Sequence, residues 1–396
     1  MSRAAGASEQ DRSPPLITDL IPDARRRSRM RARLVDWFAS AARDLPWREQ
    51  PTPYRVWVSE IMCQQTQIAT VLPYFQRFIE KYPDATALAE ANENELMRMW
   101  EGLGYYRRAR SMQAAAKHIV AEHGGEFPLQ YEDALSLPGI GRYTAGAILS
   151  ISSNQRLPIL EGNTLRVFSR LIGLKAPVDE KQSQALLWSF AEKLLPRKTA
   201  VSDRQTGPAA VNQAAMELGA LICTPRDPKC LICPLAKSCV AYARGWQSEI
   251  PVKSAKIIYE SRTEYAAVIR DSAGRWLVRQ IPPGARFAGM WDFPKAGPPE
   301  AQDLTEFTGW LSDQVGGSLK IGQHLLSMKH AVTKYRITLQ VHQAVRHGPK
   351  PPAPWSFHTA DELTHLPMST TGRRLLNRLR NQGTVRTGKG GVAPEE

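Results

Sequence analysis

The chain has 396 residues, of which 42% are hydrophobic and 23% are charged, as in folded globular domains rather than disordered or fibrous proteins. At about 150 residues per domain, this length predicts two or three domains. Lysine and arginine outnumber the acidic residues by 52 to 38, giving a net charge of +14 that favours a polyanionic partner such as nucleic acid. A basic protein without such a partner is the alternative.

The sequence predicts neither a membrane protein nor a secreted one. No apolar run approaches the length that spans a bilayer, and residues 1–24 lack the apolar core of a signal peptide. We expect residues 1–24 to form a disordered arm. Four of the five cysteines lie within 17 residues, unlike the spread of a secreted disulfide framework, so we expect an intracellular, cytoplasmic location.

Helical patterns dominate residues 25–243. An arginine-rich run over 25–33 leads into the first expected helix, either as a solvated face or as a contact to phosphates. Apolar residues at i, i+3 and i+4 spacing over 68–78 predict an amphipathic helix, directly after the polar residues 64–67. A mainly α domain is therefore expected in this half.

A glycine-containing turn, Leu-Pro-Gly-Ile-Gly-Arg-Tyr-Thr-Ala over 137–145, joins two expected helices. Gly139 and Gly141 permit a tight turn, and the N–H groups that open the next helix can then point at one phosphate. An ordinary joint between two helices would use the same glycines.

Four cysteines, Cys223, Cys230, Cys233 and Cys239, follow the spacing C-x6-C-x2-C-x5-C. Four thiolates this close in sequence can surround one inorganic centre. The spacing differs from the paired C-x2-C units that zinc usually takes, so it favours an iron–sulfur cluster, with zinc as the alternative. Cys63 lies far away in sequence and is expected to pack in the core or to line a pocket.

The sequence changes character at residues 244–262, which form a polar linker. Beyond it, the runs 264–269 and 275–280 flank Asp-Ser-Ala-Gly and predict a β-hairpin. Residues 263–380 are expected to form a separate α+β domain, and residues 381–396 a mobile tail. The other elements expected in this domain are a helix over 304–315 and strands over 317–326 and 335–345.

The glycine turn and the cysteine spacing together resemble the helix-hairpin-helix, 4Fe–4S superfamily of DNA glycosylases, which includes endonuclease III. Strings at 45–48 (Leu-Pro-Trp-Arg), 56–67 (Val-Trp-Val-Ser-Glu-Ile-Met-Cys-Gln-Gln-Thr-Gln) and 100–106 (Trp-Glu-Gly-Leu-Gly-Tyr-Tyr) are similar to its adenine-specific, MutY-type branch. The resemblance covers about residues 34–380. It implies a mainly α, helix-hairpin-helix catalytic domain with a 4Fe–4S cluster and a C-terminal α+β, Nudix-like domain.

Cleavage of an adenine–sugar bond needs an acid that protonates the base and a negative charge that faces the cationic sugar. Apolar neighbours favour the protonated form of Glu60, and the resemblance implies that Glu60 protonates the extruded adenine and later activates water. The second carboxyl departs from the family, because Glu161 and not aspartate precedes Gly-Asn. We expect Glu161 to stabilise the sugar cation; a lost role, leaving a slow enzyme or a lesion binder, is the alternative. Asn163 is expected to orient the carboxyls or water, although a helix N-cap would explain it equally well.

Tyr143 occupies the position at which relatives that also nick DNA carry a Schiff-base lysine. Because a phenol cannot form an imine, the resemblance implies a monofunctional glycosylase that leaves an abasic site. It also implies that Tyr143 forms a hydrogen bond near the catalytic carboxylate.

Extrusion of a base requires side chains that fill the gap and side chains that read the base. The resemblance implies two such groups: Gln64, Gln65 and Tyr105 at the wedge and the opposite base, and Trp47, Arg48 and Gln213 around the adenine. Arg226, Lys229 and Lys237 are expected near phosphates. Cys63 replaces the leucine that is usual in its string.

The string Gly-Met-Trp-Asp-Phe-Pro over 289–294 resembles the Nudix-like domain with which the family reads 8-oxoguanine. The chain has no R-E-x-x-E-E box, so nucleotide hydrolysis with magnesium is not expected. Val332-Thr333-Lys334 stands where the family often has Phe-Ser-His, and Thr333 retains the hydroxyl of the expected lesion contact. A purely structural clamp is the alternative.

These observations predict a monomeric base excision repair enzyme that acts on double-stranded DNA with adenine opposite 8-oxoguanine or guanine, without a membrane partner. An endonuclease III-like pyrimidine glycosylase with lyase activity and a non-catalytic mismatch-binding protein are the alternatives.

Overall fold

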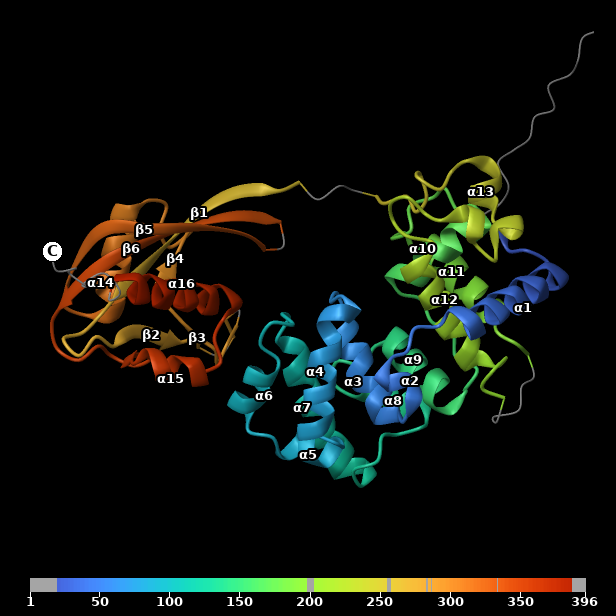
Figure 1. Cartoon of the computed structure of the whole chain (residues 1–396), viewed down its shortest axis with the longest axis horizontal. Helices are drawn as coiled ribbons and strands as arrows, with labels where there is room; N and C mark the ends of the chain where they lie inside the picture. The colour runs from blue at the N-terminus through green and yellow to red at the C-terminus, as the bar shows by residue number, and fades with distance from the viewer. Residues whose placement is uncertain are drawn as a thin grey trace, which may run out of the picture. The chain divides into compact units, whose positions relative to one another are not determined.

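The computed structural model describes residues 20–197, 203–254, 258–282, 284–285, 287–332 and 334–386. The predicted arm up to residue 19, the tail from residue 387 and Thr333 lie outside these residues. The chain divides into two compact units, Met1–Ala89 with Ala114–Lys256 and Glu90–Gln113 with Ile257–Glu396 (Figure 1). The segment Glu90–Gln113 thus belongs to the same unit as the C-terminal sheets.

The first unit is built from helices. Its elements are α1 (Ala24–Ala41), α2 (Pro46–Glu49), α3 (Pro53–Cys63), α4 (Ile68–Lys81), α5 (Ala85–Glu90), the end of α7 (Arg107–His123), α8 (Tyr131–Ser136), α9 (Arg142–Ser153), α10 (Gly162–Ile172), α11 (Lys181–Leu194), α12 (Pro208–Leu221) and α13 (Val240–Arg244), with short 3-10 turns η2 (Cys230–Ile232) and η3 (Ala236–Ser238). The mainly α prediction for this half is confirmed.

Two features predicted from local sequence patterns are present in the first unit. The predicted amphipathic helix is α4, which buries Val71, Phe75 and Phe78 along one face. The predicted glycine turn lies between α8 and α9, and Gly139 adopts φ +81°, a conformation in which a side chain would be strained.

The central helix of the first unit is α12, which packs against α1, α9 and α10, while α3 packs against α9. One apolar cluster joins α1, α10, α11 and α12; it includes Leu34 of α1, Phe168 of α10, Phe190 of α11 and Leu218 of α12. This packing brings the start of α10, the C-terminal half of α3 and the first turn of α9 to one region, although they lie up to about a hundred residues apart in sequence.

The second unit contains two β-sheets. Its elements are α6 (Glu93–Met99), β1 (Glu260–Ile269), β2 (Trp276–Gln280), β3 (Trp291–Asp292), β4 (Lys295–Ala296), α14 (Leu304–Val315), β5 (Ser318–Val332), β6 (Tyr335–His347), β7 (Trp355–His358), α15 (Ala360–His365) and α16 (Thr370–Arg386). One sheet has the order β4-β1-β6-β5, with β1 and β6 parallel, and the other has the order β3-β2-β7.

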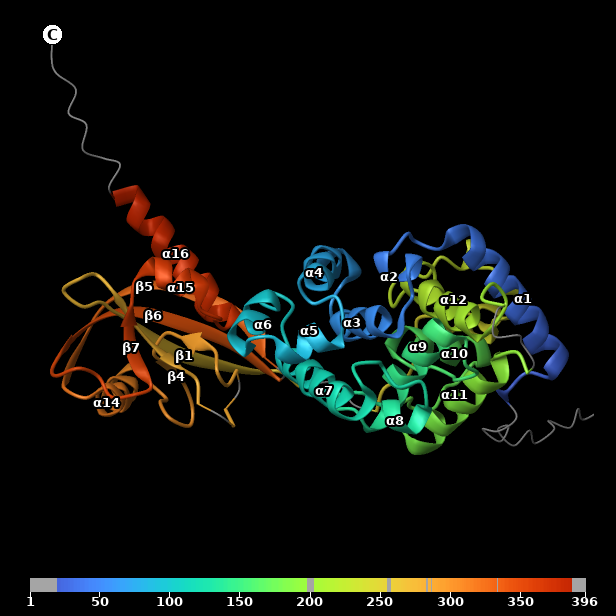
Figure 2. The same ribbon diagram turned by 90° about the horizontal axis from the view of Figure 1, so that it is seen from below.

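Helices cover both faces of the four-stranded sheet. Leu375 and Leu376 of α16 pack with Ala266 of β1, whereas Phe307 of α14 packs with Ala267, the next residue along that strand. Because successive strand residues point to opposite faces, α14 and α16 lie on opposite sides of the sheet, as Figure 2 shows. The α+β prediction is confirmed, and α14 has the predicted bounds of 304–315.

The hairpin predicted between the first two strands is wrong beyond its turn. The turn itself forms, because the Asp271 N–H donates to the Arg275 carbonyl at 3.0 Å and Arg270 pairs with Trp276. The strands then separate: β1 pairs with β4 and β6, and β2 pairs with β3 and β7. The pairing partners of an apolar strand depend on residues distant in sequence, which a local turn pattern does not contain.

No helix in the described part of the chain combines the length and the apolar character needed to cross a bilayer.

The buried Asp292 ties β3 to the start of α16. Its carboxylate accepts hydrogen bonds from the Ser369 hydroxyl at 2.5 Å and the Phe293 N–H at 2.9 Å, and pairs with Lys295 at 2.6 Å. With 2% of its surface exposed, Asp292 depends on these partners in place of water.

We expect Asp292→Ala to lower the free energy of unfolding of this domain by about 2–4 kcal/mol, because it leaves several polar groups without their acceptor. Denaturant unfolding followed by tryptophan fluorescence would measure the loss. Asp313→Ala, at an exposed position of α14, is the matched control and should change stability by less than about 0.5 kcal/mol. Equal effects of the two substitutions would contradict this account.

Candidate functional site

A cavity of about 990 Å³ in the first unit gathers all the predicted catalytic residues and several of the predicted base contacts. Its volume is at the upper end of the roughly 300–1,000 Å³ typical of ligand sites. The predicted residues that line it are Trp47, Arg48, Glu60, Cys63, Gln64, Gln65, Tyr143, Glu161 and Asn163. Side chains from α2, α3, α9 and the start of α10 therefore face one space.

Glu60 lies on α3, and only 8% of its surface is exposed. The Tyr143 hydroxyl, from the first turn of α9, donates a hydrogen bond to Glu60 Oε2 at 2.5 Å. Burial is the largest cause that raises the pKa of Glu60, and the nearby Glu161 adds to it, whereas the Tyr143 hydrogen bond opposes the shift; the resulting pKa is about 7. Burial likewise raises the pKa of Tyr143 well above its ordinary value. Glu60 is therefore an acid that can hold a proton near neutral pH.

Glu161 is the N-cap of α10, and its carboxylate is held by the helix that it starts. Glu161 Oε2 accepts the Asn163 N–H and Oε1 accepts the Thr164 N–H, each at 2.8 Å, while the Thr164 hydroxyl oxygen accepts the Glu161 N–H at 2.8 Å. This reciprocal pair is a capping box. Burial raises the pKa of Glu161, and the two backbone hydrogen bonds oppose the shift. The carboxylate is thus fixed at the cavity wall.

Asn163 is not the helix cap that the sequence left as an alternative, because Glu161 takes that place. The Asn163 side-chain oxygen accepts a hydrogen bond from Arg166 Nη2 at 2.8 Å. Arg166 also donates to the Gly219 carbonyl on α12 at 2.8 Å and to the Cys223 carbonyl at 2.7 Å. The start of α10 is therefore joined through Arg166 to α12 and to the first cysteine.

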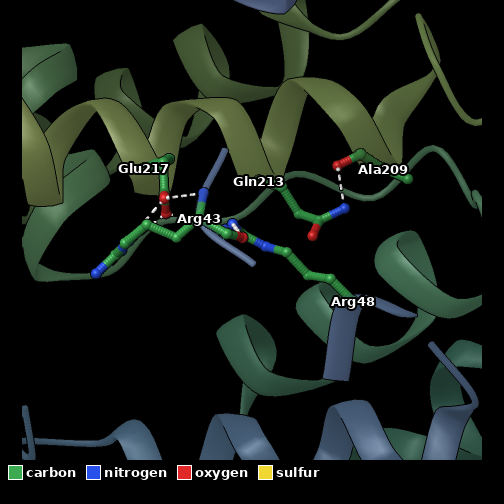
Figure 3. Close-up of polar contacts among 5 residues, drawn as sticks. All are labelled: Arg43, Arg48, Ala209, Gln213 and Glu217. Atoms are coloured by element: carbon green, nitrogen blue, oxygen red, sulfur yellow. Dashed lines mark hydrogen bonds and ion pairs between the residues drawn. The ribbon is translucent and has the colours of Figure 1, made fainter. Parts of the chain in front are cut away.

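Two arginines converge on Glu217 at the edge of the cavity (Figure 3). Glu217 lies on α12 and pairs with Arg43 Nε at 2.7 Å and with Arg48 Nη2 at 2.9 Å. Burial alone would raise the pKa of Glu217, but the hydrogen bonds from Arg43 and Arg48 outweigh it and lower the pKa to about 2. The predicted pocket residue Arg48 therefore lines the cavity with its guanidinium group fixed by Glu217.

The loop between α3 and α4 presents polar side chains to the cavity. Gln64 ends α3, and Gln65 is exposed with φ +55°, a backbone conformation that residues other than glycine seldom adopt. Trp47, from α2, is buried and packs edge-on against Phe75 of α4 at 5.0 Å between ring centroids. Cys63 lines the cavity, as one of its two predicted roles required.

Of the residues predicted at the adenine, the wedge and the opposite base, Gln213 and Tyr105 do not line this cavity. Gln213 lies one turn before Glu217 on α12, and its side-chain N–H donates to the Ala209 carbonyl at 3.4 Å (Figure 3). The α12 residues that line the cavity are Met216, Glu217 and Ala220. Tyr105 belongs to the second unit, where its side chain is 61% exposed on a tight turn.

The four cysteines of residues 223–239, called here the cysteine loop, surround one small cavity. The other residues that line it are mostly apolar: Val167, Arg170, Leu171, Leu218, Ile222, Ala236, Ala241, Tyr242 and Gln247. The buried Arg170 donates from Nη1 to Cys223 Sγ at 3.3 Å and to the Thr224 carbonyl at 2.8 Å. The arrangement offers four sulfur ligands, an apolar wall and a donor to one sulfur.

The four thiols and the apolar wall offer the ligands and the surroundings that a cluster of several irons takes. A zinc site needs its four sulfurs about 2.3 Å from one ion. Among the described residues, no three cysteine, histidine or acidic side chains gather closely enough to hold one ion. The four cysteines nevertheless line the same cavity, as thiolates that bind separate irons of one cluster would.

Comparisons with known proteins agree with this geometry. The profile of the HhH-GPD superfamily of base excision DNA repair proteins matches residues 58–193, and that of the NUDIX domain matches residues 265–378. An adenine DNA glycosylase of Mus musculus is 32% identical over 91% of this chain and 80% of its own length. One of Buchnera aphidicola subsp. Schizaphis graminum is 39% identical over 62% of this chain and 68% of its own length.

The chain belongs to the adenine DNA glycosylase family. It is thus a base excision repair enzyme that hydrolyses N-glycosyl bonds. A solved structure described as a thermostable thymine-DNA glycosylase is also similar, with a TM-score of 0.50 and 26% identity over 56% of this chain and all of that one. The helix-hairpin-helix prediction and the Nudix-like prediction are both confirmed.

The sequence alone did not identify several residues that shape the site of this glycosylase. Arg43 and Glu217 form the ion-pair group, Thr164 completes the capping box, and Arg166 links α10 to the cysteine loop. Glu217 lies four residues after the predicted Gln213, so its helical position, one turn further on, was the available signal. Of its two arginine partners, Arg48 was predicted as a pocket residue, whereas no local pattern marked Arg43.

Gly219 is the point at which α12 passes the start of α10. A Cβ atom at Gly219 would lie 2.7 Å from the Asn163 Cβ and 3.1 Å from the Asn163 backbone. We expect Gly219→Ala to displace Glu161 and Asn163 and to lower the single-turnover cleavage rate of the glycosylase by about 10- to 100-fold, since small misplacements of catalytic groups are costly.

The matched control is Gly309→Ala on α14, where a new Cβ would meet nothing within 4 Å. Rates for both variants would be measured with enzyme in excess over DNA. A Gly219→Ala enzyme that cleaves like wild type would show that this helix crossing does not position the carboxyl.

Proposed function

We propose that this chain removes adenine that is paired with 8-oxoguanine or guanine in double-stranded DNA, leaving an abasic site. The observation that carries the proposal is the shared cavity, in which a protonatable Glu60 and a backbone-anchored Glu161 face the same space. Two carboxyls in different environments are the arrangement that glycosidic bond hydrolysis uses. The names of the mouse and Buchnera relatives supply the base, adenine.

The proposed reaction begins with an adenine extruded into the cavity. Glu60 gives its proton to a ring nitrogen of the base, the bonding electrons of the glycosidic bond move to the base, and an oxocarbenium sugar forms. The Glu60 carboxylate then removes a proton from the water that attacks the sugar, which restores the acid. Tyr143, hydrogen-bonded to Glu60 Oε2, orients the carboxyl through both steps.

Glu161 is proposed to stabilise the sugar cation. A charge that faces the developing cation lowers the barrier without moving, provided that it is already in place. The two backbone N–H groups of α10 that hold its oxygens fix the Glu161 carboxylate in this way. The extra methylene relative to aspartate is thus accommodated in a side chain that folds back onto its own helix. Asn163 and Arg166 support the same turn.

A monofunctional reaction follows from the side chain on α9. Tyr143 has no amine, so it cannot form the imine through which a lysine would open the sugar and nick the strand. Its hydroxyl is engaged with Glu60, which is consistent with a role in orienting the acid. The proposed product is therefore an intact strand that alkali can cut at the abasic site.

We also propose that the cysteine loop holds a 4Fe–4S cluster through Cys223, Cys230, Cys233 and Cys239. When bound, the cluster would cross-link the loop and supply four metal–thiolate bonds to its fold. Arg170 fixes the loop independently, because it donates to Cys223 Sγ and to the Thr224 carbonyl. The loop would then present Arg226, Lys229 and Lys237 to DNA phosphates.

The remaining DNA contacts are proposed from position and chemistry. The turn with Gly139 and Gly141 precedes α9, whose first N–H groups can bind a phosphate. Gln64 and Gln65 lie at the cavity and offer amide hydrogen bonds to bases, and Gln213 is proposed to approach the adenine in the complex. Thr333, which lies outside the described residues, is the proposed contact to 8-oxoguanine. The protein is proposed to act as a monomer in the cytoplasm.

Single-turnover cleavage tests the function directly. Duplexes with adenine opposite 8-oxoguanine, adenine opposite guanine, or thymine glycol would be incubated with excess enzyme, with and without alkali. We expect cleavage at adenine only after alkali and no cleavage at thymine glycol. Glu60→Gln and Glu161→Gln should each lower the rate by at least about 100-fold, whereas the exposed Glu80→Gln on α4 should not.

Other outcomes identify the other functions. Cleavage at thymine glycol without alkali would support a pyrimidine glycosylase with lyase activity, and tight binding of the mispair without cleavage would support a mismatch-binding protein. A wild-type rate for Glu161→Gln would remove that residue from the mechanism.

The rate should fall as the pH rises through about 7, because the reaction uses the protonated form of Glu60 and burial has raised its pKa to that value. Tyr143→Phe removes the hydrogen bond that opposes the shift, so the pKa of Glu60 should rise further and the alkaline limb should move to higher pH. Single-turnover rates would be measured for both enzymes from about pH 5 to about pH 9, a range that includes the alkaline limb. Superimposable profiles would contradict the assigned hydrogen bond.

A further inference from the structure

The turn that carries Tyr105 is attached to the C-terminal domain. Residues Glu90–Gln113 form one compact unit with the residues from Ile257 onward, although they lie inside the stretch 58–193 that matches the glycosylase superfamily. The polar contacts described below all lie within this unit.

A partly buried ion pair is the main attachment. Arg373 of α16 meets Glu101 in a bidentate pair, with Nε at 2.5 Å from Oε1 and Nη2 at 3.0 Å from Oε2. Only 19% of the Arg373 side chain and 15% of the Glu101 side chain are exposed. Arg373 also donates to the Leu363 and Leu366 carbonyls, each at 2.7 Å. A planar guanidinium group held by this many acceptors has one geometry, so it fixes the position of Glu101.

Further contacts flank the ion pair along the chain. Arg98, before it, lies 3.2 Å from His365 Nδ1 at the end of α15. Arg110, after it, donates from Nη2 to the Ala288 carbonyl. The Tyr106 ring meets the Phe287 ring edge-on at 6.2 Å between centroids. The segment is thus held on both sides of Glu101.

Between these contacts, the backbone forms a rigid turn with an exposed ring at its end. Gly102, Gly104 and Tyr105 have φ values of +104°, +70° and +48°. The buried Trp100 donates from Nε1 to the Gly104 carbonyl at 3.1 Å, and Arg108 donates to the same carbonyl at 3.1 Å. The Arg108 guanidinium group lies over the Tyr105 ring at 5.7 Å. With 61% of its surface exposed, Tyr105 presents an aromatic face that a nucleic acid base can stack on.

We propose that the Glu101–Arg373 pair couples the Tyr105 turn to the C-terminal domain, so that this domain sets the position of the Tyr105 ring. Arg373 is then a positioning residue: it fixes Glu101, Glu101 fixes the turn, and the turn aims the Tyr105 ring at a base of the bound duplex. The C-terminal domain thereby sets two contacts together, the proposed contact of Thr333 and that of Tyr105. This inference rests on the DNA glycosylase function proposed above and on stacking by Tyr105.

A double-mutant cycle between Tyr105→Ala and Arg373→Gln tests the inference on the full chain. The dissociation constant would be measured for a duplex with 8-oxoguanine opposite an uncleavable 2′-fluoro-adenosine. We expect each single variant to weaken binding by about 10-fold, as loss of one stacked base does, and the double variant to bind no more weakly than Tyr105→Ala alone. Arg373→Lys should restore binding in part, because it keeps the charge but not the bidentate geometry.

The matched control is Arg374→Gln, which removes an exposed charge of the neighbouring residue on α16 and should bind within about twofold of wild type. Glu101→Gln breaks the same ion pair from its other partner. It should weaken DNA binding by the same factor as Arg373→Gln, and it tests the pair independently if Arg373→Gln folds poorly. Amide hydrogen exchange should increase at residues 100–106 in both pair variants but not in the control.

Two outcomes would overturn the inference in distinguishable ways. Additive losses in the double variant would show that Arg373 acts independently of Tyr105, while the role of Tyr105 in DNA binding stands. Wild-type affinity of Tyr105→Ala would remove the stacking role and the inference together, while cleavage by wild-type enzyme would still establish the glycosylase function.

Discussion

The hydrogen bond between Tyr143 and Glu60, inside the cavity that Glu161 also lines, is the interaction on which the site depends. It fixes a buried carboxyl at the cavity, and burial is the largest cause of its raised pKa of about 7. Glu161 lines the same cavity, and its carboxylate oxygens accept hydrogen bonds from two backbone N–H groups. The different surroundings of these two glutamates are the basis of their proposed tasks, Glu60 as a proton donor and Glu161 as a fixed charge.

The packing of α9, α10 and α12 keeps the two glutamates in these different surroundings. Because α12 lies against α9 and α10 without a side chain at Gly219, the first turn of α10 can approach closely enough for Arg166 to bind both helices. On the same helix, α12, Glu217 pairs with Arg43 and Arg48 and so reduces the repulsion between these two arginines. The same contacts extend to Cys223, so the cavity and the cysteine loop share one packed framework.

Features encoded by neighbouring residues could be predicted from the sequence, and features that depend on distant partners could not. The periodicity of α4, the turn before α9 and the bounds of α14 are local patterns, and each was correct. The approach of Glu217 to its arginines, and the departure of β2 from β1, depend on pairings across many residues. The capping role of Glu161 depends only on neighbouring residues and could have been predicted. It was missed because the resemblance had already given this carboxyl a chemical role.

The most direct test of the account is the pKa of Glu60 itself. Carboxyl carbons of glutamate labelled with ¹³C would be titrated by NMR, with the Glu60 signal assigned from its absence in Glu60→Gln. The account predicts a midpoint at about 7, because burial disfavours the charged form. A midpoint close to the ordinary value of about 4.3 would contradict it, since Glu60 would then carry no proton to give at neutral pH.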